Sequence, residues 1–194
     1  MFECKDSEFK QTIPEQFSEL YSASSIQERI QSLAAEIGAW CRGVWTDSHT
    51  DVLVLPVLRG GIFFFADLAK RIDASIEISP IRTQSYQSGS NGVPVGSVAM
   101  NLDQLAVKGR VVLIVDDVCD SGRTLESLEQ KLIEMGAREV RSVVLVRRLL
   151  DTPSFVPCWV GFQYEGPEWF VGFGMDDNER WRNLPSIYVI KRGG

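Results

Sequence analysis

The sequence has few residues of the types that bind zinc or form disulfides. It contains one histidine, and its cysteines Cys4, Cys41, Cys119 and Cys158 are scattered without Cys-x-x-Cys spacing. Structural zinc sites and disulfide frameworks both need clusters of such residues. We therefore expect neither, and the scattered thiols favour a protein of the reducing cytoplasm.

Long apolar runs and blocks of like charge are also missing. No apolar run approaches the roughly 18 residues of a membrane span, and the charged N-terminus "MFECKDSEFK" lacks the apolar core of a signal peptide. The net charge is −6, without a basic cluster, so we expect no nucleic-acid or membrane partner. With 194 residues, 44% of them hydrophobic, the chain can bury the core of a single domain.

What is present is an alternation of helical and strand patterns. Ser25–Glu28 reads as an S-x-x-E capping box, followed by apolar residues at helical spacing. Further helices are predicted over 61–72 and 122–135, a loop over 87–97, and strands over 51–58, 74–86, 110–115 and 139–146. Strands that are apolar on both faces and alternate with helices are typical of a parallel α/β sheet.

The stretch "VVLIVDDVCDSGRT" (111–124) carries the first functional signal. A buried strand runs into Asp116 and Asp117, and a small-residue turn then leads into a helix. Ligands of such sheets bind beyond the carboxyl ends of the strands. The free N–H groups of the helix and the turn hydroxyls suit a phosphate, whereas two adjacent acids suit sugar hydroxyls or a metal. The pattern thus describes a ribose 5-phosphate site, or alternatively a plain strand–turn–helix whose acids only cap the helix.

Four segments together resemble the type I phosphoribosyltransferase family, in its hypoxanthine-guanine branch. They are "LRGG" (58–61), "SYQSG" (85–89), "VDDVCDSGRT" (115–124) and "EWFVGFGMDDNERWRNLP" (168–185), in the family's order and near its spacing. The resemblance covers about residues 25–191. It implies a mostly parallel twisted sheet flanked by helices, with a small hood formed largely by the C-terminal segment. We expect one domain over 1–194, with a core of about 25–148 and a hood of about 149–194 plus N-terminal residues.

The resemblance also implies roles for single residues around phosphoribosyl diphosphate (PRPP). Asp116 and Asp117 match the acids that hold the ribose hydroxyls and a metal-bound water, and Asp120 matches the proposed general base. The expected PRPP and metal residues are Leu58, Arg59, Gly60, Ser85, Tyr86, Asp116, Asp117, Asp120, Ser121, Gly122, Arg123, Thr124, Asp176 and Arg182. Among them, Asp116, Asp117 and Asp176 are the expected Mg²⁺ residues, and Arg182 is expected to bind pyrophosphate. The family has a cis peptide at the position of Leu58–Arg59, and Ser85 and Tyr86 match the root of a lid.

Base recognition is expected from the C-terminal segment, where Asp176 is one of the expected base-binding residues. Trp169 aligns with an aromatic residue that stacks on the purine, and Phe170 would offer its backbone to the base edge. Alternatively, these aromatic residues are simply buried in a core strand. The family's base-binding lysine is replaced here, and the count places Arg148 at that position. A slip of one residue would instead place Arg147 there.

The sequence therefore predicts a Mg²⁺-dependent purine-salvage enzyme that transfers the phosphoribosyl group of PRPP to hypoxanthine or guanine. Two alternatives stay open, a xanthine-preferring enzyme and a PRPP-sensing regulatory protein. The apolar helix at 61–72 suggests a subunit interface, and relatives are usually dimers or tetramers.

Overall fold

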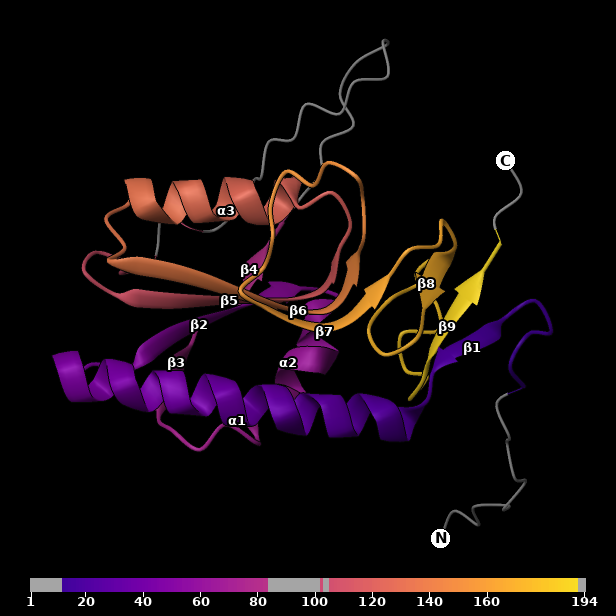
Figure 1. Ribbon diagram of the computed structural model, residues 1–194, viewed down its shortest axis with the longest axis horizontal. Helices are drawn as coiled ribbons and strands as arrows, with labels where there is room; N and C mark the ends of the chain where they lie inside the picture. Colours follow the sequence, from indigo (N-terminus) through magenta and orange to yellow (C-terminus); the bar gives the residue numbers. More distant parts are fainter. Residues whose placement is uncertain (1–11, 84–101, 103–104, 192–194) are drawn as a thin grey trace, which may run out of the picture.

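The computed structural model describes residues 12–83, 102 and 105–191, arranged around two sheets (Figure 1). Ser85, Tyr86 and the expected loop over 87–97 lie outside the described residues. The larger sheet has six strands and the smaller one has three. The fold is the expected α/β architecture, with a mostly parallel central sheet and a small hood at one end of it.

The larger sheet is built from the strands that the apolar runs predict. Its order is β3-β2-β5-β6-β7. Strand β4 pairs with the later residues of β2, after those that pair with β3, and every pairing in this sheet is parallel. The bounds are β2 Val52–Leu58, β3 Ile76–Ile78, β4 Ile81–Arg82, β5 Val111–Cys119, β6 Glu139–Arg148 and β7 Trp159–Tyr164.

Helices cover both faces of this sheet, which explains why its central strands are apolar throughout. Helices α1 (Ala23–Ser48) and α2 (Gly61–Ala69) lie on one face and α3 (Arg123–Glu134) on the other (Figure 1). Along β5 the side chains alternate between these two cores, because successive residues of a strand point to opposite faces. Leu113 and Val115 belong to the core beneath α1 and α2, whereas Val112 and Ile114 belong to the core beneath α3.

The start of α1 differs from the capping box expected at Ser25–Glu28. The N-cap is Ser22, whose side chain accepts a hydrogen bond from Ser25 N at 3.3 Å. Ser25 Oγ in turn donates to Ser22 O at 2.8 Å. Both positions 22 and 25 are serines, and the S-x-x-E pattern selected Ser25 as the cap. The helix in fact begins one turn earlier, after Ser22. The apolar spacing itself is confirmed, because Ile26, Ile30 and the following core residues are buried.

Two other elements differ from the lengths that the sequence predicts. The strand predicted over 74–86 is divided into β3 and β4 by Ser79 and Pro80, although both pieces pair with β2. Proline has no N–H for a sheet ladder, so the division falls where the sequence interrupts the hydrogen bonding. Helix α2 ends at Ala69, three residues before the expected end.

The hood is the antiparallel sheet β1-β9-β8, formed by Ser18–Tyr21, Ile187–Ile190 and Trp169–Val171. The N-terminal part of the chain therefore contributes β1 to it. The expected division at residue 148 does not follow the sheets, because β7 pairs with β6 in the larger one. Phe170, Phe173 and Met175 of the hood pack into the core beneath α1 and α2, which fixes the hood beside the ends of the strands (Figure 1).

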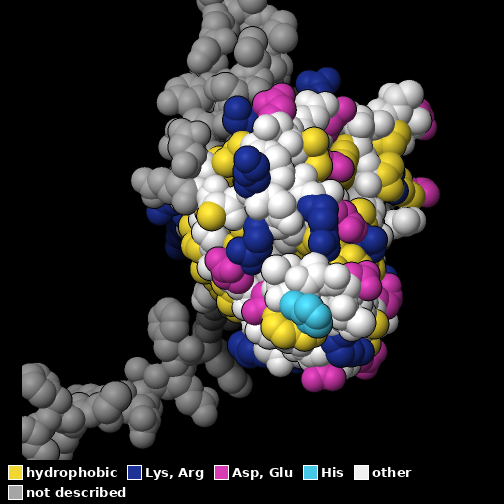
Figure 2. Space-filling model, turned by 90° about the vertical axis from the view of Figure 1, so that its left-hand side faces the viewer, with side chains coloured by type: hydrophobic (Ala, Val, Ile, Leu, Met, Phe, Trp, Pro, Cys, Tyr) yellow, Lys and Arg dark blue, Asp and Glu magenta, His cyan; other side chains and the backbone are white. Residues whose placement is uncertain are grey.

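The end of the molecule opposite the hood has a mixed surface. Basic and acidic side chains are interspersed there among uncharged ones (Figure 2). Within the described ranges, no helix has both the length and the apolar character that crossing a membrane would require.

The position of the α1 cap gives a stability prediction. Ser22→Ala should lower the free energy of unfolding by about 1 kcal/mol, because it removes the acceptor for an N–H group at the helix start. Glu28→Ala should have almost no effect, since Glu28 is exposed and is not part of the observed cap. Urea unfolding of both variants checks this, and a larger loss for Glu28→Ala would contradict the assignment.

Candidate active site

The candidate site lies where the carboxyl end of β5 meets two glycine-containing turns. A Cβ atom on Gly60, at the start of α2, would collide with the Asp117 carboxylate. A Cβ atom on Gly174, in the hood, would collide with Gly60 O, and Gly174 has a φ of +102°. The three segments therefore approach so closely that only glycine fits at the two contact points. The Leu58–Arg59 peptide in the first of these turns is cis, as the resemblance implied.

Asp116 and Asp117 form a pair of adjacent carboxylates at the end of β5, with Asp116 buried and Asp117 partly buried. Asp116 is 9% exposed, and its Oδ1 accepts from Asp117 N at 2.9 Å. Asp117 Oδ1 accepts from Val118 N, also at 2.9 Å. Burial, followed by the neighbouring charge of Asp117, raises the pKa of Asp116 well above its usual value. Burial also raises the pKa of Asp117, opposed in part by its hydrogen bonds with Asp116 and Val118 N and, least, by the nearby charge of Arg182. Two adjacent buried acids of this kind would gain from a cation or from hydroxyl donors.

The turn at 121–124 leads into α3 as predicted, and Arg123 N lies 3.5 Å from Ser121 Oγ. Gly122 has a φ of +87° and cannot cap the helix with a side chain. The structure gives a further reason for this glycine, because its Cβ would lie 2.8 Å from Phe155 Cβ. Ser154 also donates to Ser121 O through its backbone N and its Oγ, at 3.1 and 2.8 Å. The segment after β6 thus packs against the turn and supports its shape.

A pocket opens between the end of β5 and the hood. It is lined by Asp117, Val118, Asp120, Arg148, Trp169, Phe170, Met175, Asp176 and Arg182. Most of these residues were expected at the site, although they come from four separate parts of the sequence. The structure places Arg148 in the pocket lining, and Arg147 is not among the lining residues.

Arg148 is held by contacts on every nitrogen of its guanidinium group. Its Nε donates to Asp120 Oδ1 at 2.8 Å, Nη1 donates to Gly166 O, and Nη2 donates to Glu168 O at 3.0 Å. The group also lies 4.5 Å from the centre of the Phe170 ring. These three hydrogen bonds use three of the five N–H donors of an arginine. The side chain is therefore oriented in the pocket and still offers N–H groups on both Nη atoms.

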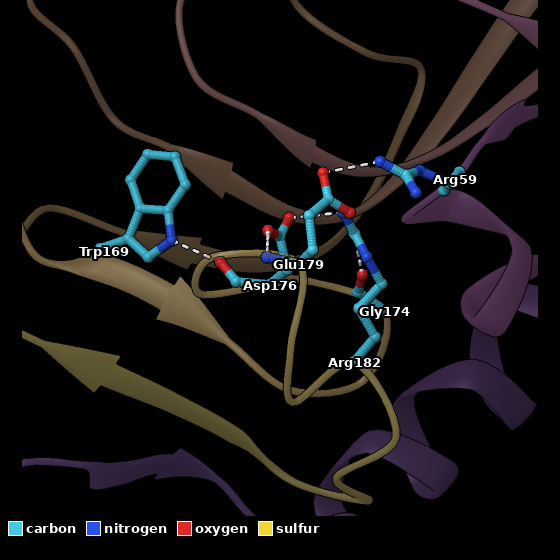
Figure 3. Close-up of polar contacts among 6 residues, drawn as sticks. All are labelled: Arg59, Trp169, Gly174, Asp176, Glu179 and Arg182. Atoms are coloured by element: carbon cyan, nitrogen blue, oxygen red, sulfur yellow. Dashed lines mark hydrogen bonds and ion pairs between the residues drawn. The ribbon is translucent and has the colours of Figure 1, made fainter.

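The two aromatic residues of the pocket differ in exposure. Phe170 is buried and packs with Arg148 and Tyr164, so it is a core residue that also lines the pocket. Trp169 is 43% exposed, and its Nε1 donates to Asp176 O at 2.7 Å (Figure 3). That hydrogen bond fixes the indole at the pocket wall, with surface available for a flat ligand.

Asp176 and Arg182 belong to a network that includes a residue without a predicted role, Glu179 (Figure 3). Arg182 donates to Gly174 O at 2.6 Å and pairs with Asp176 Oδ1 at 2.6 Å. Glu179 pairs with Arg59 at 2.6 Å and with Arg182 at 3.5 Å. In the sequence, only the spacing of opposite charges at 179 and 182 pointed to such a contact.

The acids of the site are divided between two places. Within the described part of the chain, no three Asp, Glu, His or Cys side chains form a cluster able to hold a metal ion. Mg²⁺ usually binds one or two carboxylates and completes its shell with water and substrate phosphates. The donor set of Asp116, Asp117 and Asp176 fits that mode of binding better than it fits a site made of protein ligands alone.

Comparisons with known proteins identify the family of this chain. The model of the phosphoribosyl transferase domain matches residues 22–178. The hypoxanthine-guanine phosphoribosyltransferase of Lactococcus lactis is 41% identical over 72% of this chain and 75% of its own. That of Mycobacterium avium is 35% identical over 89% and 85%. A crystal structure of a Staphylococcus aureus hypoxanthine phosphoribosyltransferase superimposes with a TM-score of 0.78, at 26% identity, over 90% of this chain and 91% of that one.

The chain belongs to the phosphoribosyl transferase domain family, in the branch whose curated members are hypoxanthine-guanine phosphoribosyltransferases.

The raised pKa of Asp116 predicts that its ionised carboxylate lowers the stability of the fold at neutral pH. A carboxyl whose pKa is raised in the folded state lowers stability once pH exceeds its unfolded pKa, because the folded state binds more protons. Asp116→Asn should therefore raise the melting temperature at pH 7, by about 2–4 °C if the cost is about 1 kcal/mol. The gain should vanish near pH 4 and below, where the carboxyl is increasingly protonated in both states.

Thermal unfolding of Asp116→Asn across this pH range tests the expectation. Asp151→Asn, at an exposed position beyond β6, serves as the matched control and should leave the melting temperature nearly unchanged. A melting temperature that falls at pH 7 would show that the ionised pair does not destabilise the fold.

Proposed function

We propose that the protein transfers the 5-phosphoribosyl group of PRPP to a 6-oxopurine, giving IMP or GMP and pyrophosphate. The observation that carries this proposal is the pocket, which brings Asp117 and Asp120 of the strand end together with Arg148, Trp169 and Arg182. The names of the curated relatives support the same activity. In this proposal, residues 1–194 act as one unit, with the larger sheet holding PRPP and the hood holding the base.

The proposed PRPP contacts follow the three segments of the site. The turn 121–124 binds the 5-phosphate through its N–H groups and hydroxyls, at the positive end of α3. Asp116 and Asp117 bind the ribose hydroxyls. Arg182 and the backbone of 58–60 bind the pyrophosphate. Ser85 and Tyr86, which lie outside the described residues, remain predicted contacts to the same substrate.

Mg²⁺ is the proposed cofactor. Asp116 and Asp117 would hold it at one place and Asp176 at another, together with oxygens of PRPP. When bound, it would neutralise negative charge on the pyrophosphate leaving group. The raised pKa values of Asp116 and Asp117 fit this role, because a cation offsets the cost of burying two adjacent carboxylates.

In the proposed reaction, purine N9 attacks the anomeric carbon of the ribose as the bond to pyrophosphate breaks. Asp120 receives the proton from purine N7. Its Oδ1 is held by Arg148 Nε, so the proton would go to Oδ2, and the ion pair would keep the carboxylate oriented. Arg182 stabilises the charge that develops on the leaving pyrophosphate.

Arg148 is the proposed reader of the base. A 6-oxopurine presents an acceptor at O6, whereas adenine presents an amino donor at position 6. Arginine can only donate hydrogen bonds, so with adenine the remaining N–H donors of Arg148 would face the donors of the amino group. Trp169 would stack on the ring, and Phe170 would contact the base through its backbone.

The proposed assembly is a homodimer or homotetramer in the cytoplasm. The α2 residues Ile62 and Phe63 are 45% and 36% exposed, which suits a contact with a second copy. Cys41, Cys119 and Cys158 are free thiols, as a reducing compartment favours. The mixed charges at the end opposite the hood give no support for a nucleic-acid partner (Figure 2).

The decisive experiment measures nucleotide formation from PRPP and Mg²⁺ with hypoxanthine, guanine, xanthine and adenine. We expect turnover of hypoxanthine and guanine, and loss of it when excess chelator removes Mg²⁺. Preferential turnover of xanthine would favour the sister activity. No turnover with any base would point to a PRPP-binding regulator, which binding of PRPP alone would then identify.

Base selectivity gives a prediction with an internal control. Arg148→Ala should lower kcat/KM for hypoxanthine by on the order of 10²-fold or more, because it removes the donors that face the base. Arg147→Ala, one residue away and outside the pocket lining, should have a small effect. For the unaltered protein, kcat/KM should be at least about 10³-fold lower with adenine than with guanine. A larger loss for Arg147→Ala would move the base-reading role by one residue.

A further inference from the structure

The carboxylate of Glu179 links two arginines that come from different parts of the fold (Figure 3). Its Oε1 lies 2.6 Å from Nη2 of Arg59, in the turn after β2, and its Oε2 lies 3.5 Å from Nη2 of Arg182, in the hood. One anionic group therefore bridges the two cationic side chains that stand on either side of the site.

The backbone holds Glu179 in this position. Asn178 and Glu179 have φ angles of +50° and +62°, a region that residues other than glycine seldom adopt. Glu179 N donates to Asp176 Oδ2 at 2.8 Å, and Asp176 Oδ1 pairs with Arg182. The turn thus directs the Glu179 side chain across the site toward Arg59.

We propose that Glu179 occupies, in the substrate-free protein, the anion position between Arg59 and Arg182, and that a pyrophosphate group displaces it. The inference rests on the proposed function, which assigns Arg182 and the turn at 58–60 to pyrophosphate. The chemistry is shared, because carboxylate and phosphate oxygens accept hydrogen bonds from the same guanidinium donors. Glu179 is therefore a competitor of the ligand for these arginines.

The geometry allows Arg59 to exchange Glu179 for a ligand, and it keeps Arg182 in position when Glu179 leaves. Arg59 and Glu179 are 64% and 60% exposed, and exposed ion pairs contribute little to stability. Arg182 is 21% exposed, and Gly174 O and Asp176 hold it independently of Glu179. When Glu179 leaves, Arg182 stays in place for the ligand and Arg59 becomes free to turn toward it.

A different role for Glu179 predicts the opposite change in pyrophosphate affinity when its charge is removed. If Glu179 served to orient the arginines for the ligand, removing its charge would weaken pyrophosphate binding. If it competes with the ligand, Glu179→Gln should strengthen binding, because the same-shaped amide neither pairs with the arginines as strongly nor repels the incoming anion.

The test is calorimetric titration of inorganic pyrophosphate, with Mg²⁺ present, into the full chain. Glu179→Gln should lower the Kd by about threefold to fivefold, the change expected for one exposed ion pair. The control Glu165→Gln removes an exposed acid between β7 and β8 and should leave the Kd unchanged. In an Arg59→Gln background the effect of Glu179→Gln should shrink, since one of the two arginines is gone. Thermal unfolding should show Glu179→Gln as stable as the unaltered protein.

The outcomes separate this inference from the proposed function. Pyrophosphate binding that Glu179→Gln leaves unchanged or weakens would overturn the inference alone. Absence of pyrophosphate binding by the unaltered protein would overturn both, whereas tighter binding by Glu179→Gln that is reduced in the Arg59→Gln background supports it.

Discussion

The site depends on how closely Gly60 approaches its neighbours. The Asp117 carboxylate lies where a side chain on Gly60 would stand, and Gly60 O lies where a side chain on Gly174 would stand. This contact brings the end of β5, the start of α2 and the hood together without intervening side chains. Asp116 is buried and Asp117 partly buried beside this contact, and burial is the largest cause of their raised pKa values. Any larger residue at Gly60 would push the acids away from the pocket.

Much of the fold could be predicted because its strongest signals are local. The apolar runs at 52–58 and 111–115 are buried on both sides, so no reading other than a covered parallel strand suits them. Where the signal was ambiguous, the prediction was less accurate. Ser22 and Ser25 are both acceptable caps, and the choice between them depends on where the chain leaves β1. Residues 159–164 look like part of the aromatic C-terminal segment, yet β7 completes the larger sheet because β6 offers it an edge.

The residues of the site could be predicted one by one where a family motif covers them. The contacts that these residues make with one another could not be predicted. Asp120 and Arg148 are distant in sequence, and their ion pair exists only because β5 and β6 are neighbours in the sheet. Glu179 had no predicted role, since its partner Arg59 lies in another segment entirely. Gly122 was expected among the PRPP residues, and the structure shows that it also makes room for Phe155. Contacts of this kind depend on tertiary packing, which single-sequence patterns do not report.

The pairing of β1 with β9 has a consequence for the order in which the protein is made. β1 precedes every strand of the larger sheet in the described chain, but its partner β9 is the last strand of that chain. During synthesis the larger parallel sheet can be completed at β7 while β1 still waits for β9. Contacts between segments so distant in sequence form slowly, because a long loop must close first. The binding pocket needs the hood as its second wall, so within the described chain we expect it to be completed after the larger sheet.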